Sequence, residues 1–324
     1  MTQAEVATEK QRLHLPKLKP NSGFLVYGAL ILLAIVLFII SPGCFTPTNL
    51  LIMARQAAPM GIVAIGQTFV IISGGIDLSV GSIILLTNVL TAGLIGSDES
   101  MTLPVILLCL GIAFIIGALN AFGTIRYKIP PLIMTLAMAN IVSGACYIWT
   151  KGAPTGMIPA SMRYLGMDFW GPFPIPVVFW LIFVVIGYIL LQRNTFGRRV
   201  FATGSNSAAA LHAGVSVAKV RAISYIMCSV LACATGILLS GYIGTTSMTL
   251  GNLYQFSPII ATVIGGTPFG GGMGSMSGTF AGTLMVTVLN CILTIVNMGP
   301  QAKQIINGLI LIGIVLIYTE RRRD

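Results

Sequence analysis

The sequence predicts an all-α polytopic membrane protein with about ten transmembrane helices and both termini in the cytoplasm. Three observations lead to this prediction. Hydrophobic residues make up 56% of the 324 residues and charged residues only 8%, whereas an ordinary soluble domain has roughly 25% charged residues. Apolar runs approaching the roughly 20 residues that cross a bilayer follow one another along the chain. Lys and Arg gather on alternate sides of these runs.

The apolar runs define the expected spans. Their approximate edges are 24–40, 50–72, 79–96, 103–124, 130–150, 173–191, 220–243, 254–265, 277–297 and 301–318. The third and eighth are short and flanked by glycine, so we expect eight to ten spans. The first run is longer than the apolar core of a usual signal peptide and no A-x-A pattern follows it. We therefore expect it to be retained as the first helix.

The positions of Lys and Arg predict the orientation, because cytoplasmic loops carry an excess of both. With a cytoplasmic N-terminus, the inner segments hold fourteen of these residues and the outer segments four. The expected organisation is a cytoplasmic tail at 1–23, a single transmembrane domain at 24–318 and a basic cytoplasmic tail at 319–324. The domain includes a cytoplasmic loop at 192–219.

The composition and motifs argue against several other functions. The net charge is +10, but the basic residues lie in short clusters without the aromatic-lined basic face of a nucleic-acid-binding protein. The six cysteines are isolated and the two histidines lie far apart, so no metal site is expected. Neither glycine-rich run matches GxGxxG, and the chain has no GxxxxGK[ST] motif. We expect no nucleic-acid partner, no catalytic residue and no cofactor bound by this chain.

The first informative segment, residues 73–82, joins the second and third expected spans. The pair Gly74 and Gly75 ends one span, and the next begins within a few residues. Asp77 stands nearly alone as an acidic residue in the apolar part of the chain. Its carboxylate suits the start of a helix near Ser79, and an intramembrane carboxylate also suits a protein-lined cavity. Two interpretations stay open and can coexist: a capped re-entry of the chain, and direct participation of these four residues in a transport pathway.

The second informative segment, residues 263–275, echoes the first. An apolar run ends at Gly265 and Gly266, followed by Thr267, and a new run begins after further glycines. Glycine-interrupted spans in both halves of a membrane protein point to a substrate pathway and its gating. The predicted topology places both interruptions on the same side, so the echo does not itself establish an inverted repeat. Glycines spaced by four residues predict close helix packing where this stretch is helical: Gly266, Gly270, Gly274, Gly278 and Gly282.

The third informative segment lies within the loop 192–219. Asn206 is typical of a helix N-cap, Ala208 and Ala209 favour a helix, and Gly214 suits the position just after a helix end. A two-turn helix at the cytoplasmic face is therefore expected. Either a connector on the lipid surface or a docking element for a partner fits this pattern.

Neutral polar residues within the spans are candidates for a substrate path. They are Gln67, Asn88, Asn120 and Asn140, with Asn290 as a further example. Amide side chains suit a hydroxylated neutral solute, and they equally suit hydrogen bonds between helices. Both interpretations stay open.

Together these motifs resemble the permease subunits of ribose-type ABC sugar importers, which form one larger group with branched-chain amino-acid permeases. The resemblance is carried by GQTFVIISGGIDLSVGS at 66–82, by Gly197-Arg198 with the segment 204–217, and by IGGT at 264–267 with GGMG at 271–274. These motifs follow the order of the family and span nearly the whole chain. Two local departures are Pro268 after the Gly-Gly-Thr and His212 in place of a small or polar residue.

The resemblance implies a permease subunit of an ATP-driven, binding-protein-dependent importer for a ribose-like monosaccharide, in the bacterial cytoplasmic (inner) membrane. Separate ABC ATPase subunits would use ATP and Mg and dock on a coupling helix in the loop 192–219. The residues implied for this coupling are Asn206, Ala208, Ala209, Leu211, Gly214 and Val215. A second permease copy or a sister permease would complete the pathway, and a periplasmic or extracellular sugar-binding protein would deliver the sugar.

Three alternatives remain. The chain is a branched-chain amino-acid ABC permease, a stand-alone secondary carrier with Asp77 as its coupling site, or a channel-like or structural membrane protein. An ion-coupled carrier normally needs ionisable or cation-coordinating groups at membrane depth. Their scarcity in this sequence argues against the carrier.

Overall fold

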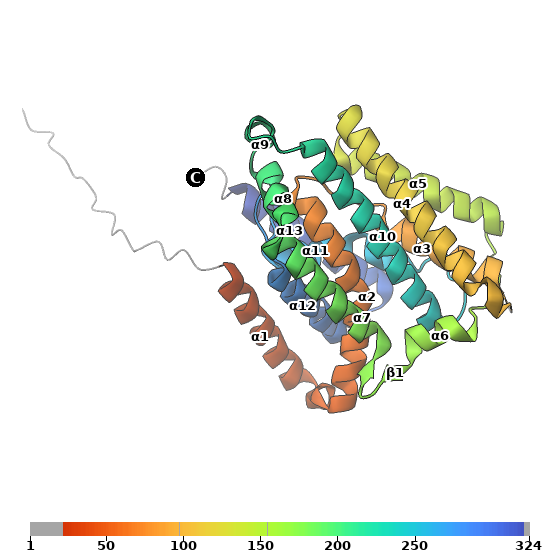
Figure 1. The fold of residues 1–324 in the computed structure, drawn as a ribbon. Helices are drawn as coiled ribbons and strands as arrows, with labels where there is room; N and C mark the ends of the chain where they lie inside the picture. The colour runs from red at the N-terminus through yellow and green to blue at the C-terminus, as the bar shows by residue number, and fades with distance from the viewer. Residues whose placement is uncertain (1–21, 97, 154, 321–324) are drawn as a thin grey trace, which may run out of the picture.

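The computed structural model describes residues 22–96, 98–153 and 155–320, and this part of the chain is predominantly helical (Figure 1). The helices are α1 (Ser22–Ile40), α2 (Pro47–Ile72), α3 (Val80–Ile95), α4 (Thr102–Arg126), α5 (Pro131–Thr150), α6 (Ala160–Met167), α7 (Ile175–Tyr188), α8 (Thr195–Ser205), α9 (Ser207–His212), α10 (Val217–Ile243), α11 (Leu253–Ile264), α12 (Met276–Ile295) and α13 (Pro300–Glu320). Two short 3-10 helices, η1 (Pro42–Phe45) and η2 (Glu99–Met101), a π-helical turn η3 (Ile189–Arg193) that continues α7, and a two-stranded hairpin of β1 (Phe169–Trp170) and β2 (Phe173–Pro174) complete it.

Each apolar run of the sequence corresponds to a helix of the structure, with small differences at the ends. Within the described residues, six helices are long and apolar enough to cross a membrane: α2, α4, α5, α7 with η3, α10 and α12. Shorter apolar helical stretches occupy α1, α3 and α11. The predicted class of helical multi-pass membrane protein is confirmed. The predicted tails at 1–23 and 319–324 lie almost entirely outside the described residues.

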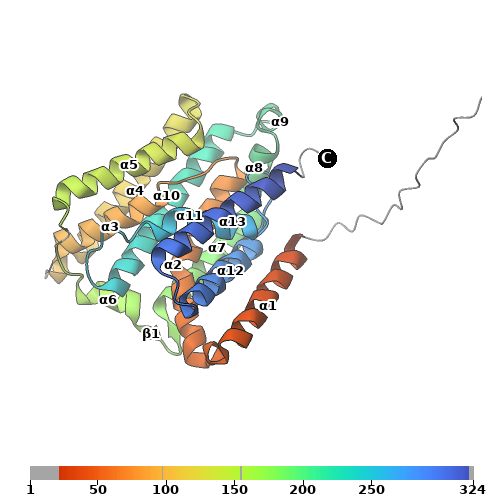
Figure 2. The same ribbon diagram turned by 180° about the vertical axis from the view of Figure 1, so that it is seen from behind.

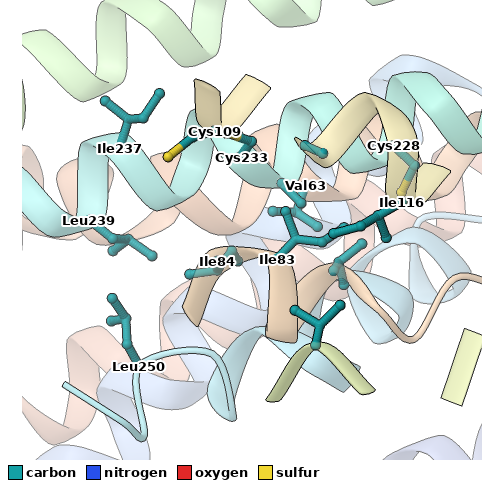
Figure 3. Close-up of a cluster of buried hydrophobic side chains, with 14 of the residues drawn as sticks. Val63, Ile83, Ile84, Cys109, Ile116, Cys228, Cys233, Ile237, Leu239 and Leu250 are labelled. Carbon is teal, nitrogen blue, oxygen red and sulfur yellow. The ribbon is translucent and has the colours of Figure 1, made fainter. Parts of the chain in front are cut away.

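Helix α10 lies at the centre of one half of the molecule and packs against α2, α3, α4 and α6. Buried side chains from α2, α3, α4 and α10 meet there, as Figure 3 shows for Val63, Ile83, Ile116 and Cys228. Glycines permit the close approach of these helices. A Cβ atom on Gly117 of α4 would lie 2.7 Å from the Cα of Ile226 in α10. A side chain at this position would push the two helices apart.

Helices α1, α11, α12 and α13 form the other side of the molecule, with α11 packed against both α12 and α13 (Figure 2). Gly278 and Gly282 of α12 face the backbone carbonyls of Gly265 and Ala261, leaving no room for a Cβ. The predicted close packing therefore applies to these two glycines. Gly274 does not belong to this helix face, because it precedes α12 and has φ +151°.

The two ends of the molecule carry different features. The α8–α9 segment lies at one end, and α6 with the β1–β2 hairpin lies at the opposite end (Figure 1). The segments that follow α2 and α11 reach the same end as α8. We call residues 73–79 break 1 and residues 265–275 break 2.

Candidate functional site: two interrupted helices and the α8–α9 segment

Break 1 begins with two backbone hydrogen bonds that end α2. The N–H of Gly74 donates to the carbonyl of Ile71 at 3.0 Å, and that of Gly75 donates to the carbonyl of Val70 at 2.9 Å. Gly74 has φ +88°, the left-handed conformation in which glycine carries no Cβ penalty. This is the helix-ending motif that glycine after an apolar run favours. The paired glycines therefore stop α2 inside an otherwise continuous apolar sequence.

Break 2 repeats this geometry at the end of α11. The N–H of Gly266 donates to the carbonyl of Val263 at 3.0 Å, and that of Thr267 donates to the carbonyl of Thr262 at 3.2 Å. Gly266 has φ +93°, close to the value at Gly74. The two segments, which are similar in sequence, therefore also end their helices with the same backbone conformation.

The two breaks touch each other. The N–H of Gly272 in break 2 donates to the carbonyl of Ile72, the last residue of α2, at 2.9 Å. A Cβ on Gly271 would lie 3.2 Å from the Cα and N of Gly74. The bond satisfies one of the carbonyls that a helix leaves unpaired at its end. The end of α2 and break 2 are therefore in direct backbone contact.

Asp77 caps the return of the chain into α3. Its Oδ1 accepts hydrogen bonds from the N–H of Ser79 at 2.9 Å and from the Ser79 hydroxyl at 2.6 Å. Both residues are fully buried. The Asp77 Oδ2 has no hydrogen-bond partner among the described residues. The structural interpretation of Asp77 agrees with this geometry, and its part in a transport pathway stays a prediction.

Two of the candidate path residues hold break 1 in place. The Nε2 of Gln67 in α2 donates to the backbone carbonyl of Asp77, and the Nδ2 of Asn120 in α4 donates to the Ser79 hydroxyl at 2.9 Å. Thr135 of α5 adds a third tie, because its hydroxyl accepts the N–H of Leu78 at 3.1 Å. Break 1 is therefore fixed to three helices by buried hydrogen bonds.

The other two candidate path residues lie elsewhere. The Nδ2 of Asn88 in α3 donates to the Ser240 hydroxyl at 3.0 Å, while its Oδ1 accepts the N–H of Ser247 at 2.8 Å. Asn88 thus fastens the segment between α10 and α11. Asn140 is exposed on the surface of α5. Gln67, Asn88 and Asn120 act as ties between elements, and a role in solute passage stays a prediction for all four.

The expected short helix after Asn206 is present as α9. The Asn206 Oδ1 accepts the N–H groups of Ala208 and Ala209, both at 3.0 Å. Gly214 follows the helix with φ +80°, and the N–H of Val215 donates to the carbonyl of Ala210 at 2.9 Å. The predicted N-cap and helix end are confirmed. The exposed residues of α9 include Ala208, Ala209 and Leu211.

Helix α8, which the sequence did not predict as a separate element, connects α9 to both breaks. A Cβ on Gly204, near its end, would collide with the Ile72 carbonyl and the Gly272 N–H. The Ser205 hydroxyl donates to the Gly272 carbonyl at 3.4 Å. The cap that begins α8, in which the Asn194 Oδ1 accepts the Phe196 N–H, is the local signal that predicts such a helix. The end of α8 therefore contacts the chain at the point where the end of α2, just before break 1, meets break 2. We call this point the junction of the breaks.

A cavity of about 590 Å³ lies at the same end of the molecule, lined by residues of break 1, α9 and α10 and by the segment from the end of α4 to the start of α5. Leu211 and Arg221 border it. The Arg221 Nε donates to the carbonyl of Ser73 at 3.3 Å, so a cation stabilises the C-terminal end of α2. In the sequence, Arg221 is one of the basic residues that indicate the orientation. Its position early in α10, close to a helix end, adds a polar link between α10 and break 1.

This arrangement is suited to moving helices. The site joins the surface helix α8 to the end of α2 and to break 2 by backbone contacts. Transporters place their substrate and gating elements at such interruptions. The fold and the site together define a multi-pass membrane permease.

Comparison with known proteins agrees with this class. Residues 49–315 match the family model described as "Branched-chain amino acid transport system / permease component", and the chain belongs to this family. It is 33% identical to the ribose import permease protein RbsC of Bacillus subtilis, over 98% of both chains. It is 32% identical to the L-arabinose transport system permease protein AraH of Escherichia coli, over 91% of this chain and 89% of that protein. No solved structure gives a significant match.

Proposed function

We propose that this chain is the permease subunit of an ATP-driven, binding-protein-dependent importer and forms the translocation pathway for a monosaccharide. The observation that carries the proposal is the contact of α8 with Ile72 and Gly272, which places a surface segment on the end of α2 and on break 2. The ribose and arabinose permeases among the relatives support the substrate class. The family description favours branched-chain amino acids as the alternative substrate.

The proposed topology has ten spans: α1 to α5, α7 and α10 to α13. The termini, both breaks and the loop 192–219 face the cytoplasm, and the β1–β2 hairpin faces outward. The distribution of Lys and Arg supports this orientation. The chain would lie in the cytoplasmic (inner) membrane of a bacterium.

The proposed partners supply what this chain does not carry. Separate ABC ATPase subunits would bind ATP and Mg and dock on α9, so this subunit would bind no cofactor and would not be an enzyme. A second copy of the permease or a sister permease would complete the pathway, and a binding protein would deliver the sugar at the outer end. The exposed residues of α9 and its rigid capping support α9 as the docking element.

In the proposed mechanism, closure of the ATPase pair displaces α9 and, through α8, the junction of the two breaks. Inward- and outward-open states must differ in affinity for the partners, because otherwise ATP hydrolysis would not shift their populations. Glycines at the breaks permit the backbone change without a side-chain penalty.

The test is to purify the tagged chain from its native membranes in mild detergent and identify the proteins that accompany it. An ATPase with a Walker motif is then reconstituted with the permease and the co-purified binding protein in liposomes. We expect ATP-dependent uptake of radiolabelled ribose or L-arabinose, with L-leucine as the competing substrate. Transport by the purified chain alone under an ion gradient would instead identify a secondary carrier, and leucine uptake would identify an amino-acid permease.

A further inference from the structure

Two neighbouring cavities lie beside α11 and α13, away from the junction of the breaks, and the second is also lined by α2 and α12. Their volumes are about 340 Å³ and 310 Å³, within the usual range for small-molecule sites. Leu253, Ser257 and Asn307 border both cavities. The cavities therefore adjoin one another across the side chains of Ser257 and Asn307.

Asn307 is the residue that points to a ligand. It is 7% exposed, and its Oδ1 has no hydrogen-bond partner among the described residues. Buried amide oxygens are normally satisfied, because an unpaired acceptor keeps the cost of its desolvation. A ligand hydroxyl in either cavity would supply the missing donor.

The lining combines apolar side chains with amide and hydroxyl groups and lacks carboxylates. Amide and hydroxyl groups line the two cavities, among them Gln304 on one side and Asn290 and Thr294 on the other. Neither lining contains Asp or Glu. Lys303 is the basic residue of the lining, and its Nζ donates to the Thr294 hydroxyl at 2.7 Å. An amino acid would leave its ammonium group without a carboxylate partner, whereas a neutral polyol finds donors and acceptors.

The position of the cavities also suits a pathway. Helix α11 has 12 residues and is roughly 18 Å long at 1.5 Å per residue, which is less than the hydrocarbon core of roughly 30 Å. Break 2 ends α11 at the proposed cytoplasmic side, so its first residues, next to the cavities, lie at membrane depth. Discontinuous helices form solute sites at this depth in many transporters.

We infer that these two cavities form one binding site for a neutral polyhydroxylated solute, with Asn307 as its central hydrogen-bonding residue. This inference rests on the proposed function and specifies the substrate class and its place in the pathway. It assigns solute contact to α11, α12 and α13, and leaves Gln67, Asn88 and Asn120 as ties between helices.

The test compares Asn307→Leu with Gln301→Leu in the complete transport system. Leucine is similar in size and branching to asparagine but cannot form hydrogen bonds, and Gln301 is an exposed amide on the same helix that borders neither cavity. We expect Asn307→Leu to lower ATP-driven ribose or L-arabinose uptake at least tenfold, with unchanged membrane content and partner association. Gln301→Leu should stay within twofold of the unmodified protein. Equal uptake by Asn307→Leu and the unmodified protein would overturn the inference.

A second measurement does not depend on transport. Asn307→Cys is made after alanine replacement of Cys44 and Cys291, the two partly exposed cysteines, and is treated with a small hydrophilic thiol reagent. We expect labelling that a high ribose concentration slows, whereas Asn88→Cys, which is fully buried outside the cavities, stays unlabelled. Absence of labelling at position 307, or labelling that ribose leaves unchanged, would count against the site. Absence of ATP-driven sugar uptake by the unmodified system would contradict the proposed function instead.

Discussion

The backbone N–H of Gly272 donates to the carbonyl of Ile72 at 2.9 Å, and this bond joins the two interrupted helices of the molecule. Ile72 is the last residue of α2, and Gly272 lies in break 2, which follows α11. Gly204, near the end of α8, packs against both the Ile72 carbonyl and the Gly272 N–H. Helix α8 therefore contacts the end of α2 and break 2 at one point.

Gly204→Ala tests this junction. A Cβ at Gly204 would meet the Ile72 carbonyl and the Gly272 N–H, so backbone has to move. Overpacking of this kind costs about 1–3 kcal/mol. We expect a lower melting temperature in detergent and a loss of ATP-driven uptake. Gly144→Ala is the matched control, because a Cβ on that helical glycine meets nothing within 4 Å; similar effects of both variants would contradict the role of the junction.

Substitutions at Asp77 separate a structural role from ion coupling. Asp77→Asn keeps an Oδ1 that accepts the Ser79 N–H and hydroxyl, so we expect ATP-driven uptake within twofold of the unmodified protein. Asp77→Leu leaves both donors unpaired and should cost about 1–3 kcal/mol of stability. Thermal unfolding in detergent and uptake by reconstituted vesicles measure the two effects. Abolition of transport by Asp77→Asn in a stably folded protein would favour Asp77 as a coupling group.

The sequence predicted the local features of the site because they depend on a few neighbouring residues. Gly74 and Gly214 adopt positive φ at helix ends, and Asn206 accepts the first free N–H groups of α9. Each follows from the conformational preference of one residue type. The apolar runs likewise predicted the helices, because hydrophobic length is a property of the segment itself.

The contact between Ile72 and Gly272 was beyond prediction from this single sequence. It joins segments far apart in the chain, and nothing in the local pattern of either specifies the partner. The same limit applies to the buried amides: Gln67 and Asn307 both lie in apolar segments, yet one ties a backbone carbonyl and the other borders two cavities. The apolar residues around Gln67 and Asn307 predict that both amides lie within a span, but they do not predict which neighbour each amide faces.

Gly282→Leu tests the packing of α11 against α12. The Cβ position of Gly282 collides with the carbonyl of Ala261, so a leucine would separate the two helices. We expect a melting temperature in detergent clearly below that of the unmodified protein. Gly111→Leu on the exposed side of α4 is the control, because no atom lies within 4 Å of its Cβ position. An unchanged melting profile for Gly282→Leu would show that this contact contributes little.

Ala209→Arg tests the docking surface without disturbing the helix that carries it. Ala209 is exposed, and its part in the cap of α9 is its backbone N–H, which any residue except proline supplies. Arginine is also a good helix former. We expect at least tenfold less ATPase in the purified complex and a matching loss of sugar uptake, with unchanged insertion and melting temperature.

The control for Ala209→Arg is Ala153→Arg, which adds the same charge at an exposed position in the loop after α5. That loop follows the proposed outer end of α5, so the ATPase content of this complex should equal that of the unmodified protein. If both variants retain the ATPase, the exposed face of α9 is not the docking surface, and the contact of α8 with the breaks has only a packing role. If Ala209→Arg alone loses it, the partner docks on α9, next to the helix α8 whose Gly204 contacts the end of α2 and break 2, as the proposed mechanism requires.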